Sequence, residues 1–118
     1  MAAPPELSFV PHLLPIARGI LSTLHVGFSK PASAEVLADA YSTAYASAPF
    51  VRVLSAGNLP ELKAVVGTPR AEIGFVLLPG NKRAVLVCVI DNLLKGAASQ
   101  AVQNFNRMTG FQEEEGLA

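Results

Sequence analysis

The stretch from Asp91 to Gln100 holds the residues best suited to binding a ligand. Asp91 and Asn92 are typical helix caps, so we expect a helix to begin there with unpaired backbone N–H groups and partial positive charge. Lys95 adds a full charge, and Gly96 with the two alanines that follow lets a ligand or another backbone approach closely. This helix start is a candidate site for an anion or a cofactor. Close packing of the helix against a neighbouring sheet is the alternative.

The single cysteine and the two histidines offer less chemistry. Cys88 lies in the apolar run from 84 to 90, so we expect a buried structural thiol and no stabilised thiolate. His12 and His25 have no carboxylate or second histidine at ligand spacing, so the sequence predicts no metal site. We interpret His25 as an ordinary strand residue. His12, between two prolines and followed by Arg18, is the more interesting polar position.

Composition excludes several classes of protein. A chain of 118 residues is bounded to one domain, and 51% hydrophobic with 15% charged residues excludes intrinsic disorder. Nine basic and nine acidic residues leave no charge excess to attract nucleic acid or an anionic membrane, so neither is an expected partner.

No apolar run reaches the roughly 20 residues of a membrane span, and the first residues lack the features of a signal peptide. One cysteine needs no oxidising compartment, so we expect a cytoplasmic protein.

The pattern of apolar residues and turn residues predicts an α+β fold. Strands are predicted at 7–10, 20–28, 50–54, 71–78 and 83–90, with a strand or extended arm starting at Leu62. The turn at 79–82 joins the last two strands as a hairpin, and both look buried on both faces. Ser33 predicts a helix that ends before Pro49, and Asp91 predicts a second helix that ends at Gly110. We therefore expect a mainly antiparallel sheet with two helices packed on one face.

The mean hydropathy of +0.40 is high for a chain with so large a share of surface. We therefore expect some apolar surface to be covered by a second copy or by a domain outside this sequence.

A series of motifs carries a family resemblance. In order they are FVPHLLP (9–15), RGILST (18–23), PFVRV (49–53), VVGTP (65–69) with Ile73-Gly74, and DNLLKGAASQAVQN (91–104). With this order and spacing the chain resembles N-acetyl-gamma-glutamyl-phosphate reductase, the NADPH-dependent enzyme of arginine biosynthesis. The match runs from about Leu7 to the C-terminus, and its last stretch is the most specific.

The resemblance implies that residues 1–118 are the C-terminal portion of an α+β substrate and dimerisation domain, of the glyceraldehyde-3-phosphate-dehydrogenase-like C-terminal type, with no dinucleotide-binding domain. Complete members of the family attack an acyl phosphate with a cysteine, release phosphate, and reduce the thioester to a semialdehyde with hydride from NADPH. Their nucleophile and Gly-rich cofactor loop lie upstream of the matching region. We therefore expect no catalytic residue here and no activity of the isolated chain.

The same resemblance assigns site residues. It places His12 and Arg18 near the substrate, where a guanidinium fork suits a carboxylate or a phosphate. It places Asn92, Lys95 and Gly96 at the NADP cofactor, in agreement with the physical argument above.

Two alternatives stay open. One is a non-catalytic dimerisation or interaction module, and the other is a segment of the similar aminoadipyl-phosphate reductase of lysine biosynthesis. The expected partners are a second copy or a dinucleotide-binding domain, with a small acyl phosphate as substrate of the complete enzyme.

Overall fold

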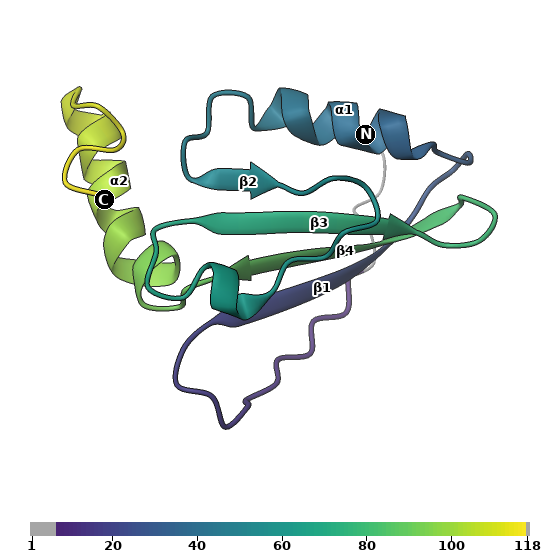
Figure 1. Ribbon diagram of the computed structural model, residues 1–118, viewed down its shortest axis with the longest axis horizontal. Coiled ribbons are helices and arrows are strands. Elements are labelled where there is room, and N and C mark those ends of the chain that lie inside the picture. Colours follow the sequence, from purple (N-terminus) through teal and green to yellow (C-terminus); the bar gives the residue numbers. More distant parts are fainter. Residues whose placement is uncertain (1–6, 118) are drawn as a thin grey trace.

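Four strands pair into one sheet in the order β1-β4-β3-β2 in the computed structural model, which describes residues 7–117 (Figure 1). The central strand β4 is antiparallel to β1 and to β3, and the short strand β2 is parallel to β3. The elements are β1 (Ile20–Gly27), α1 (Ala34–Ala44), β2 (Val51–Val53), the 3₁₀ turn η1 (Leu62–Ala64), β3 (Ala71–Leu77), β4 (Arg83–Ile90), the π-helical turn η2 (Leu94–Ala98) and α2 (Ser99–Thr109). The predicted α+β class with a mainly antiparallel sheet is confirmed.

The turn between β3 and β4 has the chemistry that the sequence predicted. Pro79 and Gly80 occupy its centre, and the Asn81 N–H donates to the Leu78 carbonyl at 2.9 Å. Gly80 has a φ of +84°, which a residue without a Cβ adopts at little cost. The hairpin register follows, with Leu77 opposite Ala84 and Phe75 opposite Leu86.

Both faces of the β3–β4 hairpin are covered, as predicted. On one face Val87 and Val89 pack with Val65, which follows η1 and is fully buried. On the other face α1 lies over the sheet, and the Tyr41 ring stacks on Phe75 with 5.9 Å between centroids. Phe75 is 1% exposed, so this contact closes the second half of the core.

The first helix begins where the sequence predicted. The Ser33 hydroxyl accepts the N–H of Val36 at 3.3 Å, which satisfies one of the free N–H groups of the first turn. The helix ends at Ala44, well before Pro49.

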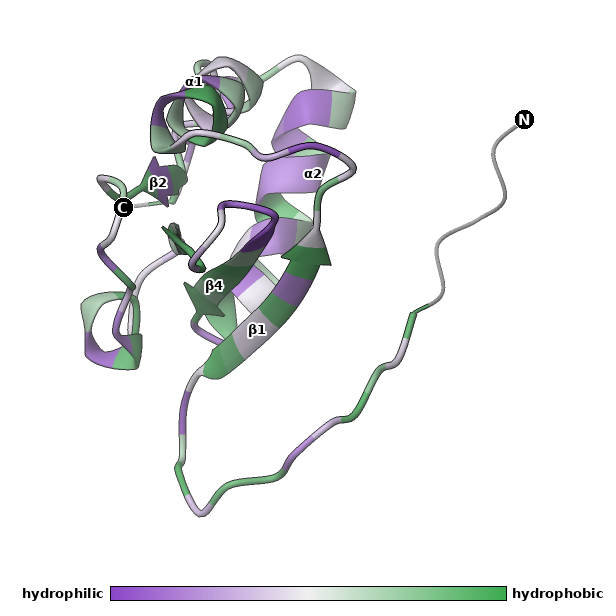
Figure 2. Cartoon of the chain, turned by 90° about the vertical axis from the view of Figure 1, so that its right-hand side faces the viewer, coloured by the Kyte–Doolittle hydropathy of each residue, from purple (hydrophilic) through white to green (hydrophobic). Residues whose placement is uncertain are grey.

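Two predicted strands are wrong. Residues 7–10 have no strand partner and belong to an extended segment, residues 7–18, which we call the N-terminal arm and which runs away from β1 (Figure 2). The segment that starts at Leu62 is the 3₁₀ turn η1, because the N–H of Val65 bonds back to the Leu62 carbonyl instead of to a neighbouring strand. The turn brings Val65 under the sheet, where burial of its side chain outweighs its preference for extended backbone.

Apolar side chains are exposed on the N-terminal arm, on β1 and on α2. The edge strand β1 is exposed on both faces, with Leu21 51% exposed. Helix α2 buries its polar side and exposes its apolar side. Its buried side chains are Ser99, Gln103 and Asn106, whereas Met108 on the opposite side is 86% exposed. A helix normally turns its apolar stripe inward, so α2 and β1 both present surface suited to a protein partner.

Replacement of Gly74 by Ala is expected to destabilise the fold. A Cβ on Gly74 would collide with the Asn58 carbonyl oxygen and would lie 2.9 Å from Cδ of Pro60, both in the loop that covers β3. Overpacking of this kind costs about 1–3 kcal/mol of unfolding free energy, measurable by urea denaturation. Gly27→Ala on β1 is the control, since nothing lies within 4 Å of the added Cβ, and it should change the free energy by less than about 0.5 kcal/mol. Equal effects of the two variants would contradict the close approach at Gly74.

Candidate functional site

Asp91 lies at the end of β4, and its carboxylate is fully buried. Oδ1 accepts the backbone N–H groups of Leu93 at 2.8 Å and Leu94 at 2.9 Å, which confirms the predicted cap. Oδ2 accepts the N–H of Gly67 at 2.8 Å and Nε of Arg18 at 3.3 Å. One side chain therefore joins the N-terminal arm, the turn after η1 and the start of the C-terminal helix.

These donors keep the buried carboxylate ionised. The Gly67 N–H lowers the pKa of Asp91 most, and the N–H groups of Leu94 and Leu93 and the charge of Arg18 act in the same direction. Burial opposes them, and the net result is a pKa of about 2 against an ordinary 3.8. Asp91 is thus a permanent anion at neutral pH.

Asn92 adds a second link to the same segment. Its Oδ1 accepts the backbone N–H of Gly19 at 2.8 Å. Gly19 has a φ of +106°, which favours glycine. Arg18, predicted from the resemblance to bind substrate, and Asn92, predicted to bind cofactor, are therefore brought to one place although they lie far apart in the sequence.

The Arg18 guanidinium is held on one side and free on the other. Its side chain is 36% exposed, and within residues 7–117 it hydrogen-bonds only through Nε, to Asp91. A guanidinium has five N–H donors, so both terminal nitrogens stay available for an oxyanion. This is the arrangement that a carboxylate or phosphate ligand needs.

His12 lies elsewhere on the N-terminal arm. Its Nδ1 is 3.1 Å from the Val10 carbonyl oxygen, and it forms no hydrogen bond to Arg18 or Asp91. An open cavity of about 1690 Å³ between the arm and β1 is lined by His12, Gly19 and Asn92 among mostly apolar side chains. His12 thus borders the same cavity as Asn92.

Lys95 and Gly96 have partners within the chain. The Lys95 ammonium lies 5.5 Å from the centroid of the Phe50 ring and donates to Oε1 of Gln103. Burial lowers the pKa of Lys95, and the nearby Glu113 carboxylate opposes this. A Cβ on Gly96 would lie 3.3 Å from the Asp91 carbonyl oxygen, so the close packing of the helix start considered above accounts for the glycine.

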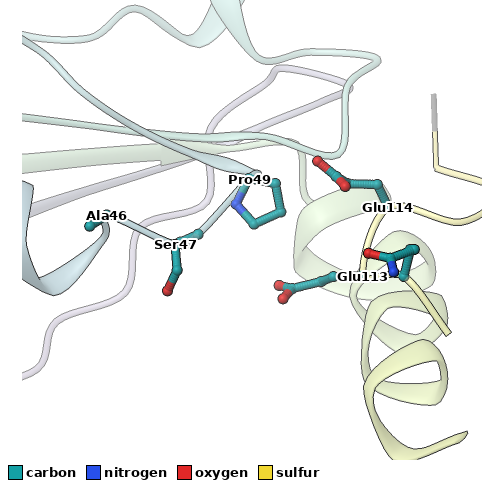
Figure 3. A pocket seen from close by; sticks show the side chains of 7 residues that line it. Ala46, Ser47, Pro49, Glu113 and Glu114 are labelled. Atoms are coloured by element: carbon teal, nitrogen blue, oxygen red, sulfur yellow. The ribbon is translucent and has the colours of Figure 1, made fainter. Parts of the chain in front are cut away.

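A shallow pocket of about 400 Å³ lies between the loop after α1 and the C-terminal segment (Figure 3). Glu113 and Glu114 line it opposite Ser47 and Pro49. Glu113 also accepts Arg107 at 3.3 Å and contacts Gln103. Two carboxylates make the pocket unsuited to an anionic substrate.

Two other predictions can be compared with the structure. Cys88, in the middle of β4, is half-buried instead of fully buried, and burial raises the pKa of its thiol, so the thiol is not activated. No cluster of three His, Cys, Asp or Glu residues able to hold a metal occurs among residues 7–117.

The sequence did not reveal the contact between Gly67 and Asp91. It gave Gly67 only as part of the VVGTP motif and Asp91 only as a cap. Their contact joins residues 24 positions apart through a backbone N–H, which has no signature in residue type.

The family model described as the semialdehyde dehydrogenase dimerisation domain matches residues 1–92. The chain belongs to this family. Its curated relatives include the N-acetyl-gamma-glutamyl-phosphate reductases of Shouchella clausii, 50% identical, and of Halorhodospira halophila, 48% identical. Each match covers 98% of this chain and 33% of the relative, so the chain spans about a third of their length. The resemblance inferred from the motifs is confirmed.

A solved structure supports the fold. The crystal structure of aspartate semialdehyde dehydrogenase II from Vibrio cholerae, complexed with ASA, matches with a TM-score of 0.58 at 24% identity, over 75% of this chain and 26% of that one. This likeness concerns the fold alone and agrees with the predicted domain type. Within the described part of the chain, every helix is too short or too polar to cross a membrane.

The charge of Asp91 predicts a pH-dependent stability. Because folding lowers its pKa from 3.8 to about 2, the ionised group favours the folded state above pH 4 or so, and this contribution disappears as the pH falls toward 2. Asp91→Asn should therefore be less stable than the parent at pH 5, with a difference that narrows toward pH 2, as measured by urea denaturation.

The exposed Asp39 on α1 is the matched control. The difference between parent and Asp39→Asn should stay small throughout the same range. A stability difference for Asp91→Asn that is independent of pH would contradict the stabilising role of its charge.

Proposed function

We propose that this chain is the C-terminal part of the substrate and dimerisation domain of an N-acetyl-gamma-glutamyl-phosphate reductase, an NADP-dependent oxidoreductase of arginine biosynthesis. The observation that carries the proposal is the identity of 45–50% to reductases of this name over nearly the whole chain. In this proposal the dinucleotide-binding domain and the nucleophilic cysteine belong to the two thirds of the enzyme outside this sequence. Such an enzyme would act in the cytoplasm, where Cys88 and the nucleophilic cysteine would stay reduced.

Arg18 would bind the acyl phosphate substrate. The substrate carries anionic oxygens in its phosphate and its carboxylate, and the terminal nitrogens of Arg18 are free to form a paired contact with either. His12 would border the substrate from the cavity between the arm and β1. Neither residue takes part in bond breaking in this proposal; both bind and orient.

The helix start would border the cofactor. Lys95, whose ammonium also donates to Gln103, supplies a positive charge suited to a phosphate group. Among residues 7–117 the Asn92 side chain uses only its Oδ1, so its amide N–H₂ can donate to the cofactor. Gly96 would let the helix start lie close to Asp91 and so hold both side chains in place. The bound cofactor supplies hydride. A dinucleotide needs phosphate contacts beyond these residues, and we assign them to the part of the enzyme outside this chain.

Self-association is the second part of the proposal. The family is described as a dimerisation domain, and the edge strand β1 exposes Ile20, Leu21 and Leu24. Apolar residues on an unpaired edge suit pairing with a second copy. A module that only dimerises would keep this surface and would need no anion site at Arg18.

A chimera tests the reductase proposal. The chain would replace the matching third of the S. clausii reductase, and we expect the chimera to reduce N-acetylglutamyl phosphate with NADPH. NADH is compared with NADPH as the cofactor, and aminoadipyl phosphate is compared with N-acetylglutamyl phosphate as the substrate. Within the chimera, Arg18→Ala should lower kcat/KM by about 10–100-fold, the usual effect of losing a charge-assisted hydrogen bond. Arg83→Ala, on an exposed arginine of β4, is the control. A folded chimera without activity, or equal rates for both variants, would contradict the proposal.

Sedimentation velocity tests the dimer. The isolated chain at micromolar concentration should sediment as a dimer, and Leu21→Glu with Leu24→Glu should convert it to a monomer, because buried unpaired carboxylates are costly. Both leucines are about half exposed, so the monomer should keep its fold. Val36→Glu, on the exposed side of α1, should leave the dimer intact. A parent chain that sediments as a monomer would show that β1 is not a self-association surface.

A further inference from the structure

The buried end of β4 determines where an exposed guanidinium is held. We propose that Asp91 is a positioning residue for Arg18: it binds Nε of the side chain and leaves the two terminal nitrogens directed at the substrate anion. The inference rests on the proposed function, in which Arg18 is the anion ligand. It adds a residue to which the family resemblance assigned no role.

The Asp91 carboxylate is a rigid acceptor. It is fully buried, and three backbone N–H groups from two separate segments fix both of its oxygens. It cannot rotate without losing at least one of them. Because Oδ2 serves Gly67 and Arg18 together, the position of the Gly67 turn also sets the position of the guanidinium.

The backbone next to Arg18 is fixed as well. The N–H of Gly19 donates to Oδ1 of Asn92 at 2.8 Å. Two neighbouring residues, Arg18 and Gly19, therefore bind two neighbouring residues, Asp91 and Asn92. A long, flexible side chain held at its backbone and at Nε has already lost most of its rotamer freedom before a ligand arrives. Such preorganisation increases affinity without adding a contact.

If Asp91 served only as a helix cap, it would need fewer hydrogen bonds than it makes. The helix cap requires only the N–H groups of Leu93 and Leu94, and both are satisfied by Oδ1. Oδ2 is the oxygen that reaches Arg18, at the partly exposed end of the contact. The cap therefore uses Oδ1, whereas Oδ2 is shared by the Gly67 turn and Arg18.

A double-mutant cycle in the chimera tests the inference. Asp91→Asn should raise the KM for N-acetylglutamyl phosphate about tenfold and change kcat less, because a lost ground-state contact weakens binding in both states. Arg18→Ala should raise KM by at least as much. The double variant should match Arg18→Ala alone, since Asp91 acts through the side chain that is missing.

Thr68→Ala controls for a loosened fold. The Thr68 hydroxyl donates to the Val65 carbonyl at 2.8 Å in the same turn as Gly67, without contacting Arg18. At a matched loss of Tm, Thr68→Ala should leave KM near the parent value. A rise of KM in Thr68→Ala equal to that in Asp91→Asn would overturn the positioning role.

The outcomes separate the two hypotheses. An unchanged KM in Arg18→Ala would refute the proposed ligand role of Arg18. A raised KM in Arg18→Ala together with a parental KM in Asp91→Asn, or with additive effects, would refute positioning alone. If Asp91→Asn does not fold, Arg18→Lys replaces it: a KM close to that of Arg18→Ala supports positioning of the fork, and a parental KM overturns it.

Discussion

The buried carboxylate of Asp91 is the interaction on which the rest of the site depends. A buried charge is costly unless it is fully hydrogen-bonded, and here each oxygen is satisfied by donors from parts of the chain that differ in sequence position. The N-terminal arm, the turn at Gly67 and the C-terminal helix start meet at this one group. If Asp91 lost its charge, its oxygens would be weaker acceptors for the three backbone N–H groups that donate to them.

The core is built so that this junction lies at the edge of a well-packed region. The hairpin β3–β4 is covered by Val65 on one face and by Tyr41 on the other, and β4 extends to Ile90. Asp91 follows directly. The carboxylate that holds Arg18 therefore lies next to a packed strand, which suits a group that must be positioned accurately.

The chain leaves apolar surface open at β1 and on α2, and both surfaces fit a segment that is a third of its relatives. Polar residues of α2 face inward, where Gln103 and Asn106 hold the C-terminal segment. Its apolar residues face outward, which reverses the usual arrangement of a helix at the surface of a complete core. The high mean hydropathy of the sequence agrees with the apolar residues that are exposed on these two surfaces and on the N-terminal arm.

The sequence by itself determined the elements whose signals are local: the turn at Gly80, the Ser33 cap, the buried strands β3 and β4, and the motifs that identify the family. The tertiary structure decided what depends on distant partners. Residues 7–10 carry strand-forming side chains but have no strand to pair with, and Val65 enters the core through a 3₁₀ turn. The resemblance named Arg18 and Asn92 separately, yet only the folded chain shows that Asp91 and Gly19 bring them together, because a backbone N–H leaves no trace in residue type.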